Sequence, residues 1–166
     1  MKKLTHLDAR GRARMVDVGG KPVTRRRAVA SILVRLTPET LARLRTGDLP
    51  KGDAAAVARL AGIQGAKLTS QIIPLCHPLP LDVVDISVLP EAEGVRILAE
   101  ARTRAATGVE MEALTGAAVA ALALIDMVKA VERDASATDL RLELKEGGKS
   151  GRWVRPGFQE PPAEAP

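Results

Sequence analysis

The sequence predicts an α+β fold in which helices cover one face of an antiparallel sheet. Strand and helix patterns follow one another in the order β-α-α-β-β-α-β, and the 166 residues include one Trp, one Phe and no Tyr. A core of Ala, Val, Leu and Ile favours close packing of helices on a sheet. With its first two helices counted as one layer, this order is that of a ferredoxin-like α/β sandwich. We expect a single such domain at 23–158, between an extended basic arm at 1–22 and a disordered tail at 159–166.

Three elements are expected in the first half of the domain. Residues 27–36, RAVASILVRL, are aliphatic and β-branched, which predicts a strand. Thr37, Pro38 and Glu39 are typical of a helix start, and that helix should end near Gly47. A second helix is expected at 53–67, where apolar residues recur at spacings of three and four.

The second half begins with an irregular stretch at 72–81, IIPLCHPLPL, whose three prolines exclude a regular helix or a central strand. Strands are predicted at 82–89 and 95–106, joined by a turn at 90–94. Thr107 and Gly108 should open a long helix that reaches about Arg133. A last strand at 138–145 and a loop, GGKSG at 147–151, complete the domain.

Positive charge is concentrated in the first 51 residues, which contain thirteen Lys and Arg against four Asp and Glu. Such a bias is typical of proteins that bind nucleic acid, a membrane surface or a phosphorylated compound, and also of a simply solvated basic segment. Cys76 is the single cysteine, which excludes an internal disulfide. The sequence shows neither a signal-peptide pattern nor an apolar run near the roughly 20 residues of a membrane span. We therefore expect a cytoplasmic protein that binds no membrane.

The long helix has polar residues at both ends. Glu110 and Glu112 fall in its first turn, and Asp126 and Lys129 are three residues apart near its end, which suits simple dipole stabilisation and a surface ion pair. However, Glu112 and Asp126 belong to one stripe whose middle is apolar, and such a stripe usually faces another surface. The fourteen residues between them span about 21 Å of helix. If both ends are functional, either there are two sites or one site is shared between chains.

His77 stands beside Cys76 in the proline-rich stretch. One His and one Cys do not make a zinc site, and since His6 is the only other histidine, no metal site is expected. His77 could bind phosphate or be a buried loop histidine. Cys76 is expected to pack as a small apolar side chain.

Basic residues in loops are candidates for anion binding. Lys51 stands just before the second helix, where free N–H groups favour anions. Lys149 lies in a glycine-rich loop that lacks P-loop spacing. Arg26 belongs to an arginine triplet that could be a nucleic-acid patch, although the scarcity of aromatic residues argues against single-strand binding.

Eight segments together resemble the cyclic pyranopterin monophosphate synthase family, the protein C family of molybdenum cofactor biosynthesis. They occur in the family's order and cover nearly the whole chain, although the residues after Phe158 have no counterpart. IPLCHPL, GVEMEAL and DMVKA are specific in combination. The segments are LTHLD at 4–8, MVDV at 15–18, KGD at 51–53, AGIQGAK at 61–67, IPLCHPL at 73–79, TGVEMEALT at 107–115, DMVKAV at 126–131 and GGKSG at 147–151.

The resemblance implies a lyase that converts the 3′,8-cyclised guanosine triphosphate derivative into cyclic pyranopterin monophosphate and pyrophosphate. It also implies a homo-hexamer, a trimer of dimers, with the site at the dimer interface. No redox or radical cofactor is required, and magnesium is an optional companion of the triphosphate.

The resemblance also implies residue roles. Asp126 and Lys129 would carry the acid–base chemistry, because their spacing lets the carboxylate tune the amine or relay its proton. Lys51, Lys149 and Arg26 would neutralise the triphosphate. His77 would contact phosphate or base, and Glu112, with Glu110 as its alternative, would accept from the guanine-derived edge. Leu75, Cys76 and Met111 complete the expected substrate-binding set.

Two other functions remain open at this stage. A nucleic-acid-binding domain of the same fold would normally stack bases on aromatic residues of its sheet, and these strands have none. A non-catalytic nucleotide-sensing module is the other alternative, against which the presence of Asp126, Lys129 and Lys149 argues.

Overall fold

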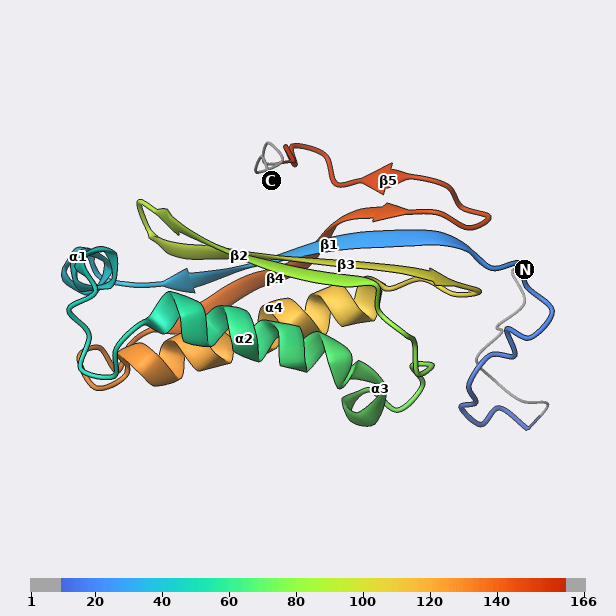
Figure 1. Ribbon diagram of the computed structural model, residues 1–166, viewed down its shortest axis with the longest axis horizontal. Coiled ribbons are helices and arrows are strands. Elements are labelled where there is room, and N and C mark those ends of the chain that lie inside the picture. The colour runs from blue at the N-terminus through green and yellow to red at the C-terminus, as the bar shows by residue number, and fades with distance from the viewer. Residues whose placement is uncertain (1–9, 161–166) are drawn as a thin grey trace.

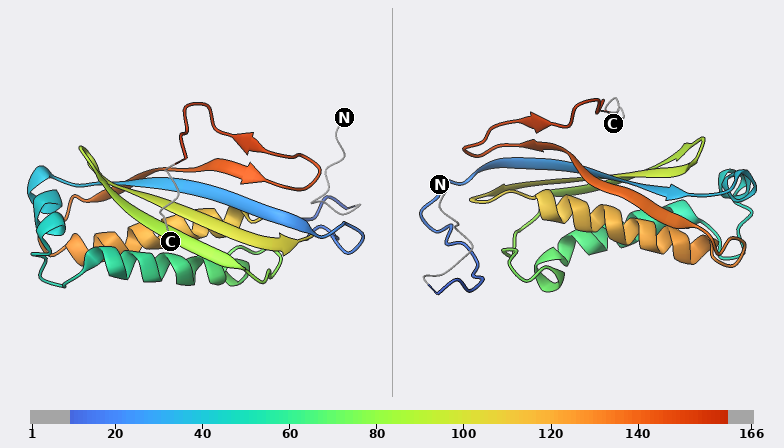
Figure 2. Two further views of the ribbon diagram at one scale, coloured as in Figure 1. Left: turned by 45° about the horizontal axis from the view of Figure 1, so that its top comes forward. Right: turned by 180° about the vertical axis from the view of Figure 1, so that it is seen from behind.

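The computed structural model describes residues 10–160, which form an antiparallel sheet with helices on one face (Figures 1 and 2). The strand order is β2-β3-β1-β4-β5, and β2-β3-β1-β4 is the ferredoxin-like order, which confirms the predicted fold. The short β5 was not expected. The strands are β1 Thr24–Arg35, β2 Val83–Glu91, β3 Gly94–Ala105, β4 Ser136–Glu146 and β5 Trp153–Val154. Part of the predicted arm (1–9) and most of the predicted tail (161–166) lie outside the described residues.

The helices are α1 Pro38–Thr46, α2 Ala54–Lys67, α3 Thr69–Ile72 and α4 Glu110–Val128. The predicted start of α1 is confirmed, with the Thr37 side chain accepting from the Thr40 amide. The start of α2, predicted from apolar spacing, is also confirmed, and there the Asp53 side chain accepts from the Ala56 amide. The prediction that the long helix reaches Arg133 was wrong. It ends at Val128, because the Glu132 carboxylate accepts hydrogen bonds from the Thr37 amide and hydroxyl and so turns the chain toward α1.

The helices α2 and α4 lie side by side under the sheet and approach each other closely through glycines (Figure 1). A Cβ on Gly65 would lie 2.6 Å from Val119 Cβ, and one on Gly62 would lie 3.0 Å from Ala120 Cβ. The apolar stripe of α4 therefore packs on α2 at Val119, as expected of a stripe that faces another surface. One turn later Leu122 is 65% exposed, so that only part of the stripe is covered.

By length and composition, α4 could cross a membrane, which corrects the expectation that no segment approaches a span. The same test is passed by the core helices of soluble proteins, and 56% of the apolar window of α4 is buried within the structure. Its buried residues pack against β1, β3 and α2. The apolar composition of α4 is therefore accounted for by its place in the core.

The sheet face opposite the helices is partly covered by the β4–β5 hairpin. An irregularity in the pairing of β1 with β4 brings Glu143 onto this face, where it is 2% exposed. Its carboxylate accepts from Ser31 Oγ at 2.5 Å and Arg141 Nε at 2.7 Å, and Arg155 Nε lies 3.4 Å away. These contacts fix the hairpin whose turn carries the loop at 147–151 at one end of β1.

Candidate functional site

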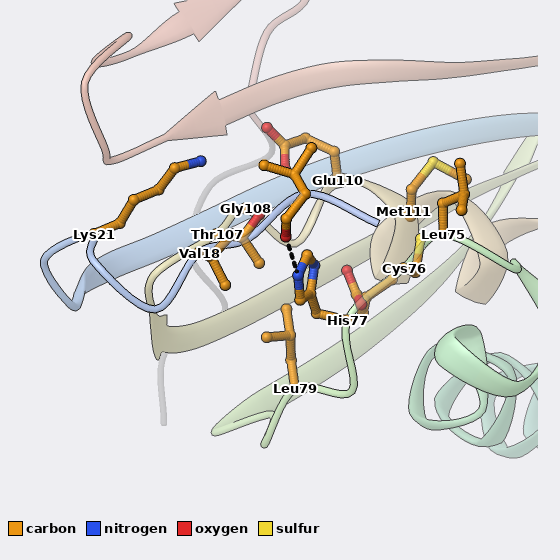
Figure 3. A pocket seen from close by; sticks show the side chains of 12 residues that line it. Val18, Lys21, Leu75, Cys76, His77, Leu79, Thr107, Gly108, Glu110 and Met111 are labelled. Atoms are coloured by element: carbon orange, nitrogen blue, oxygen red, sulfur yellow. Dashed lines mark hydrogen bonds between the residues drawn. The ribbon is translucent and has the colours of Figure 1, made fainter. Parts of the chain in front are cut away.

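A cavity of about 260 Å³ lies at the N-terminal end of α4 (Figure 3). It brings together residues from the proline-rich stretch and the first turn of α4, which are far apart in the sequence. The predicted residues that line it are Leu75, Cys76, His77, Glu110, Met111 and Glu112. Sequence reasoning missed its other lining residues, Val16, Val18, Lys21, Leu79, Thr107 and Gly108.

His77 connects the proline-rich stretch with the N-terminal arm. Its Nε2 lies 2.8 Å from the Val16 carbonyl oxygen, the contact drawn in Figure 3. A carbonyl only accepts, so Nε2 carries the hydrogen and donates it, and Nδ1 is left as an acceptor in the neutral ring. The described part of the arm is therefore a wall of the cavity. The segment MVDV at 15–18 had signalled this region, whereas no pattern singled out Lys21.

Glu112 is the more buried of the two carboxylates in the first turn of α4, with 4% of its surface exposed. Burial raises the pKa of its carboxyl above the ordinary value, and the charge of Glu110 adds to the effect, against a backbone hydrogen bond that opposes it. Both carboxylates line the cavity. The Glu110 carboxylate folds back over Gly108, and a side chain on residue 108 would overlap that carboxylate.

Cys76 faces the same carboxylate. Burial, followed by the negative charge of Glu112, raises the pKa of the Cys76 thiol. The thiol is therefore kept protonated, which suits the predicted packing role rather than that of a nucleophile.

A second cavity, of about 780 Å³, adjoins the first and shares Lys21, Thr107 and Gly108 with it. The predicted residues Arg26 and Lys149 line it, so that three cations with Lys21 surround the space. Arg26 is held by hydrogen bonds of 3.3 Å from its guanidinium to the carbonyl oxygens of Ala105 and Ala106. The arrangement is suited to a polyanion that extends from the first cavity.

Gly148 permits this arrangement. Its φ of +70° is in the left-handed region, and a Cβ there would overlap the Arg26 guanidinium. The loop at 147–151 can therefore lie directly against Arg26 only because residue 148 has no side chain.

The remaining predicted residues form a separate cluster at the other end of α4. The Asp126 carboxylate lies 2.6 Å from Lys129 Nζ and 2.8 Å from Lys51 Nζ, and Lys51 Nζ also donates to the Asp126 carbonyl oxygen at 2.7 Å. The Asp126 and Lys129 side chains are more than half exposed, and the Lys51 side chain is 38% exposed. The ammonium of Lys129, and then that of Lys51, lowers the pKa of Asp126 to about 2.

One chain does not bring the two clusters together. Glu112 and Asp126 are separated by about 21 Å along α4, and Figure 1 places the loop before α2 and the loop after α3 at opposite ends of the helix pair. The structure thus gathers the predicted residues into two groups, with His77 and Glu112 in one and Lys51, Asp126 and Lys129 in the other. Among residues 10–160, no group of three or more His, Cys, Asp and Glu could hold a metal ion.

A model described as the MoaC family matches residues 15–148. The chain belongs to the MoaC family. The matched residues include the cluster of His77 and Glu112 and that of Lys51, Asp126 and Lys129. They end one residue before Lys149.

Proteins of similar sequence carry the name cyclic pyranopterin monophosphate synthase. The one from Dinoroseobacter shibae is 57% identical over 92% of this chain and 98% of its own length. The one from Streptomyces avermitilis is 55% identical over 92% of this chain and 90% of its own. The one from Jannaschia sp. strain CCS1 is 51% identical over 97% of this chain and 100% of its own.

Proposed function

We propose that this MoaC-family chain is a cyclic pyranopterin monophosphate synthase, a lyase of molybdenum cofactor biosynthesis. The observation that carries the proposal is the shared name of relatives 51–57% identical over nearly their whole length. In the proposed reaction, the 3′,8-cyclised guanosine triphosphate derivative rearranges to cyclic pyranopterin monophosphate, and pyrophosphate leaves. The proposed location is the cytoplasm.

The two adjoining cavities suit the two halves of this substrate. Glu112 and Glu110 are acceptors for the N–H groups of the guanine-derived edge, and a desolvated carboxylate such as Glu112 favours such donors. Lys21, Arg26 and Lys149 surround the adjoining space, where a triphosphate of about four negative charges would be neutralised. Magnesium would come with the triphosphate, and no step is assigned to it.

Lys129 is the proposed acid–base group of the second cluster. Asp126 has a pKa of about 2, so it stays ionised near neutral pH and is a weak base. Its position between two ammonium groups suits a role in orienting Lys129 and Lys51. Lys51 therefore has a structural partner in addition to its proposed contact with phosphate.

The proposed site is completed by a second copy, within a homo-hexamer built as a trimer of dimers. The separation of the two clusters along α4 supports a shared site, because a substrate in the His77 cavity cannot reach Lys129 of the same chain. Exposed apolar side chains on the helices support association of copies: Leu60 on α2 is 68% exposed, and Leu122 on α4 is 65% exposed.

The direct test is turnover by the purified chain. The 3′,8-cyclised compound is supplied, and the oxidised, fluorescent pterin and the released pyrophosphate are followed together. Both should appear, and both should fall by about 10²- to 10⁴-fold in Lys129→Ala. The control is Lys67→Ala, which removes an exposed lysine from the end of α2. Binding of the compound with no product from the unmodified chain would contradict the proposal.

The shared site has its own test, in which two inactive variants are mixed. Glu112→Ala damages the first cluster and Lys129→Ala the second, so a mixed dimer contains one doubly altered site and one intact site. After dissociation and random reassociation, about a quarter of the sites should be intact. No recovery, in mixtures shown by mass to contain mixed dimers, would mean that each chain has a complete site.

A further inference from the structure

Two pairs of arginines face each other across the sheet on the side away from the helices. In the register of β1 and β3, Arg25 is opposite Arg104 and Arg27 is opposite Arg102. These positions alternate with Ala28 and Ala101, whose side chains are in the core. Like charges directly opposite each other destabilise a sheet, so two successive pairs require compensation.

The repulsion between Arg27 and Arg102 is offset by carboxylates of the same chain. One Glu100 carboxylate oxygen lies 2.8 Å from the Arg27 guanidinium, and the other lies 3.0 Å from Arg102 Nε. Glu160 adds a second contact to Arg27 at 2.9 Å. This pair shows how the sheet accommodates opposed arginines, with a carboxylate shared between them.

The next pair has no such carboxylate. Arg25 and Arg104 are exposed, and neither forms an ion pair with any residue in the described range 10–160. Both line a cavity of about 370 Å³ together with Arg26, Arg27 and Arg102. Two carboxylates also line this cavity: Glu146 is bound to Arg152 at 2.8 Å, and Asp82 has no ion pair with Arg25 or Arg104.

We propose that Arg25, Arg104 and Arg102 form a binding site for a diphosphate group, with inorganic pyrophosphate as its simplest ligand. Opposed residues are about 5 Å apart across a sheet, and alternate residues are about 7 Å apart along a strand. Three guanidinium groups at these spacings suit a ligand with two adjacent phosphoryl groups, because each can bind phosphate oxygens in a fork. The diphosphate would supply the charge that Glu100 supplies to the neighbouring pair.

This site is separate from the cavity of Lys21 and Lys149. Arg26 lines both cavities and lies between them. The proposal does not depend on turnover and is tested by binding alone, so its failure would leave the proposed function untouched.

The test is calorimetric titration of the full chain with inorganic pyrophosphate in a Lys149→Ala background, which weakens the other anion cavity. Binding should persist there, and adding Arg25→Gln with Arg104→Gln should weaken it at least tenfold. The control pair, Arg35→Gln with Arg45→Gln, removes the same charge elsewhere and should leave affinity within twofold. Absence of binding in the Lys149→Ala background, or an equal loss in the control pair, would overturn the proposal.

Thermal unfolding is a second test, because the arginines should lower the unfolding temperature without anion and increase its rise when pyrophosphate is added. Without anion, Arg25→Gln with Arg104→Gln should unfold at a higher temperature than the unmodified chain, because the repulsion across the sheet is removed. With pyrophosphate the unmodified chain should gain several degrees more than this variant. A variant that is less stable than the parent without anion would show that the two arginines stabilise the sheet, contrary to the proposal.

Discussion

Lys51 and Asp126 are 75 residues apart in the sequence, yet Lys51 Nζ lies 2.8 Å from Asp126 Oδ2 and 2.7 Å from its carbonyl oxygen. The loop before α2 is thereby attached to the last turn of α4. Asp126 also contacts Lys129 at 2.6 Å, so one carboxylate determines where two ammonium groups lie.

The charge of Asp126 should persist to low pH. Its pKa is lowered from 3.8 to about 2, so the ion pairs are fully present above 3.8 and are lost as the pH falls through about 2. Carbon NMR of the Asp126 carboxyl should give a midpoint near 2 and, in Lys129→Ala, a higher one. An unchanged midpoint in that variant would mean that Lys129 is not the main cause.

Glu112→Gln should raise the stability of the fold and lower the activity. Because burial in the folded state raises the pKa of Glu112 above its ordinary value of 4.5, the ionised form opposes folding once the pH rises through the folded-state pKa. The variant should therefore unfold at a higher temperature than the parent at pH 7, and the difference should disappear below pH 4.5. Loss of the acceptor should lower kcat/KM at least about tenfold, or ~1.4 kcal/mol. Glu39→Gln, in the exposed first turn of α1, should leave kcat/KM unchanged and should not raise the unfolding temperature, because it removes only the surface ion pair with Arg43.

Gly148→Ala should weaken substrate binding through Arg26. The new methyl group overlaps the Arg26 guanidinium and also forces alanine into a left-handed conformation. Gly151→Ala is a matched control in the same loop, since its φ is +64° but a Cβ there meets nothing within 4 Å. We expect KM to rise about tenfold, or ~1.4 kcal/mol, in the first variant and much less in the second. Equal effects would assign the loss to backbone strain alone.

Gly65→Ala should destabilise the fold, because its Cβ would lie 2.6 Å from Val119 Cβ and would push α2 away from α4. The expected loss in the free energy of unfolding is about 1–3 kcal/mol by chemical denaturation. Gly20→Ala, where a Cβ meets nothing within 4 Å, should be neutral. A neutral Gly65→Ala would mean that the helices can separate without cost.

Features set by neighbouring residues were predictable from the sequence, and features set by distant contacts were not. The Thr37 and Asp53 caps are local, and both helix starts were predicted correctly. The end of α4 depends on Glu132 reaching Thr37, 95 residues away, and was missed. The strand β5 is two residues long and gives no alternating pattern.

The candidate site shows the same division. His77 and Glu112 lie in segments that the resemblance had marked, but their meeting in one cavity is a finding of the structure. The pairing of Lys51 with Asp126, and the contribution of Lys21, depend on how the chain folds back and have no signal in the local sequence.

The glycine contacts between α2 and α4 also limit how the enzyme can move. Gly62 lies against the backbone of Gly116, and Gly65 lies against the short side chain of Val119, so the helices are too close to slide past each other without a clash. The distance between the two ends of α4 is then constant through the catalytic cycle. In the proposed reaction, a hinge within one chain therefore cannot bring Lys129 to a substrate near His77, and the proposed gating has to come from movement of a second copy or of the described part of the N-terminal arm.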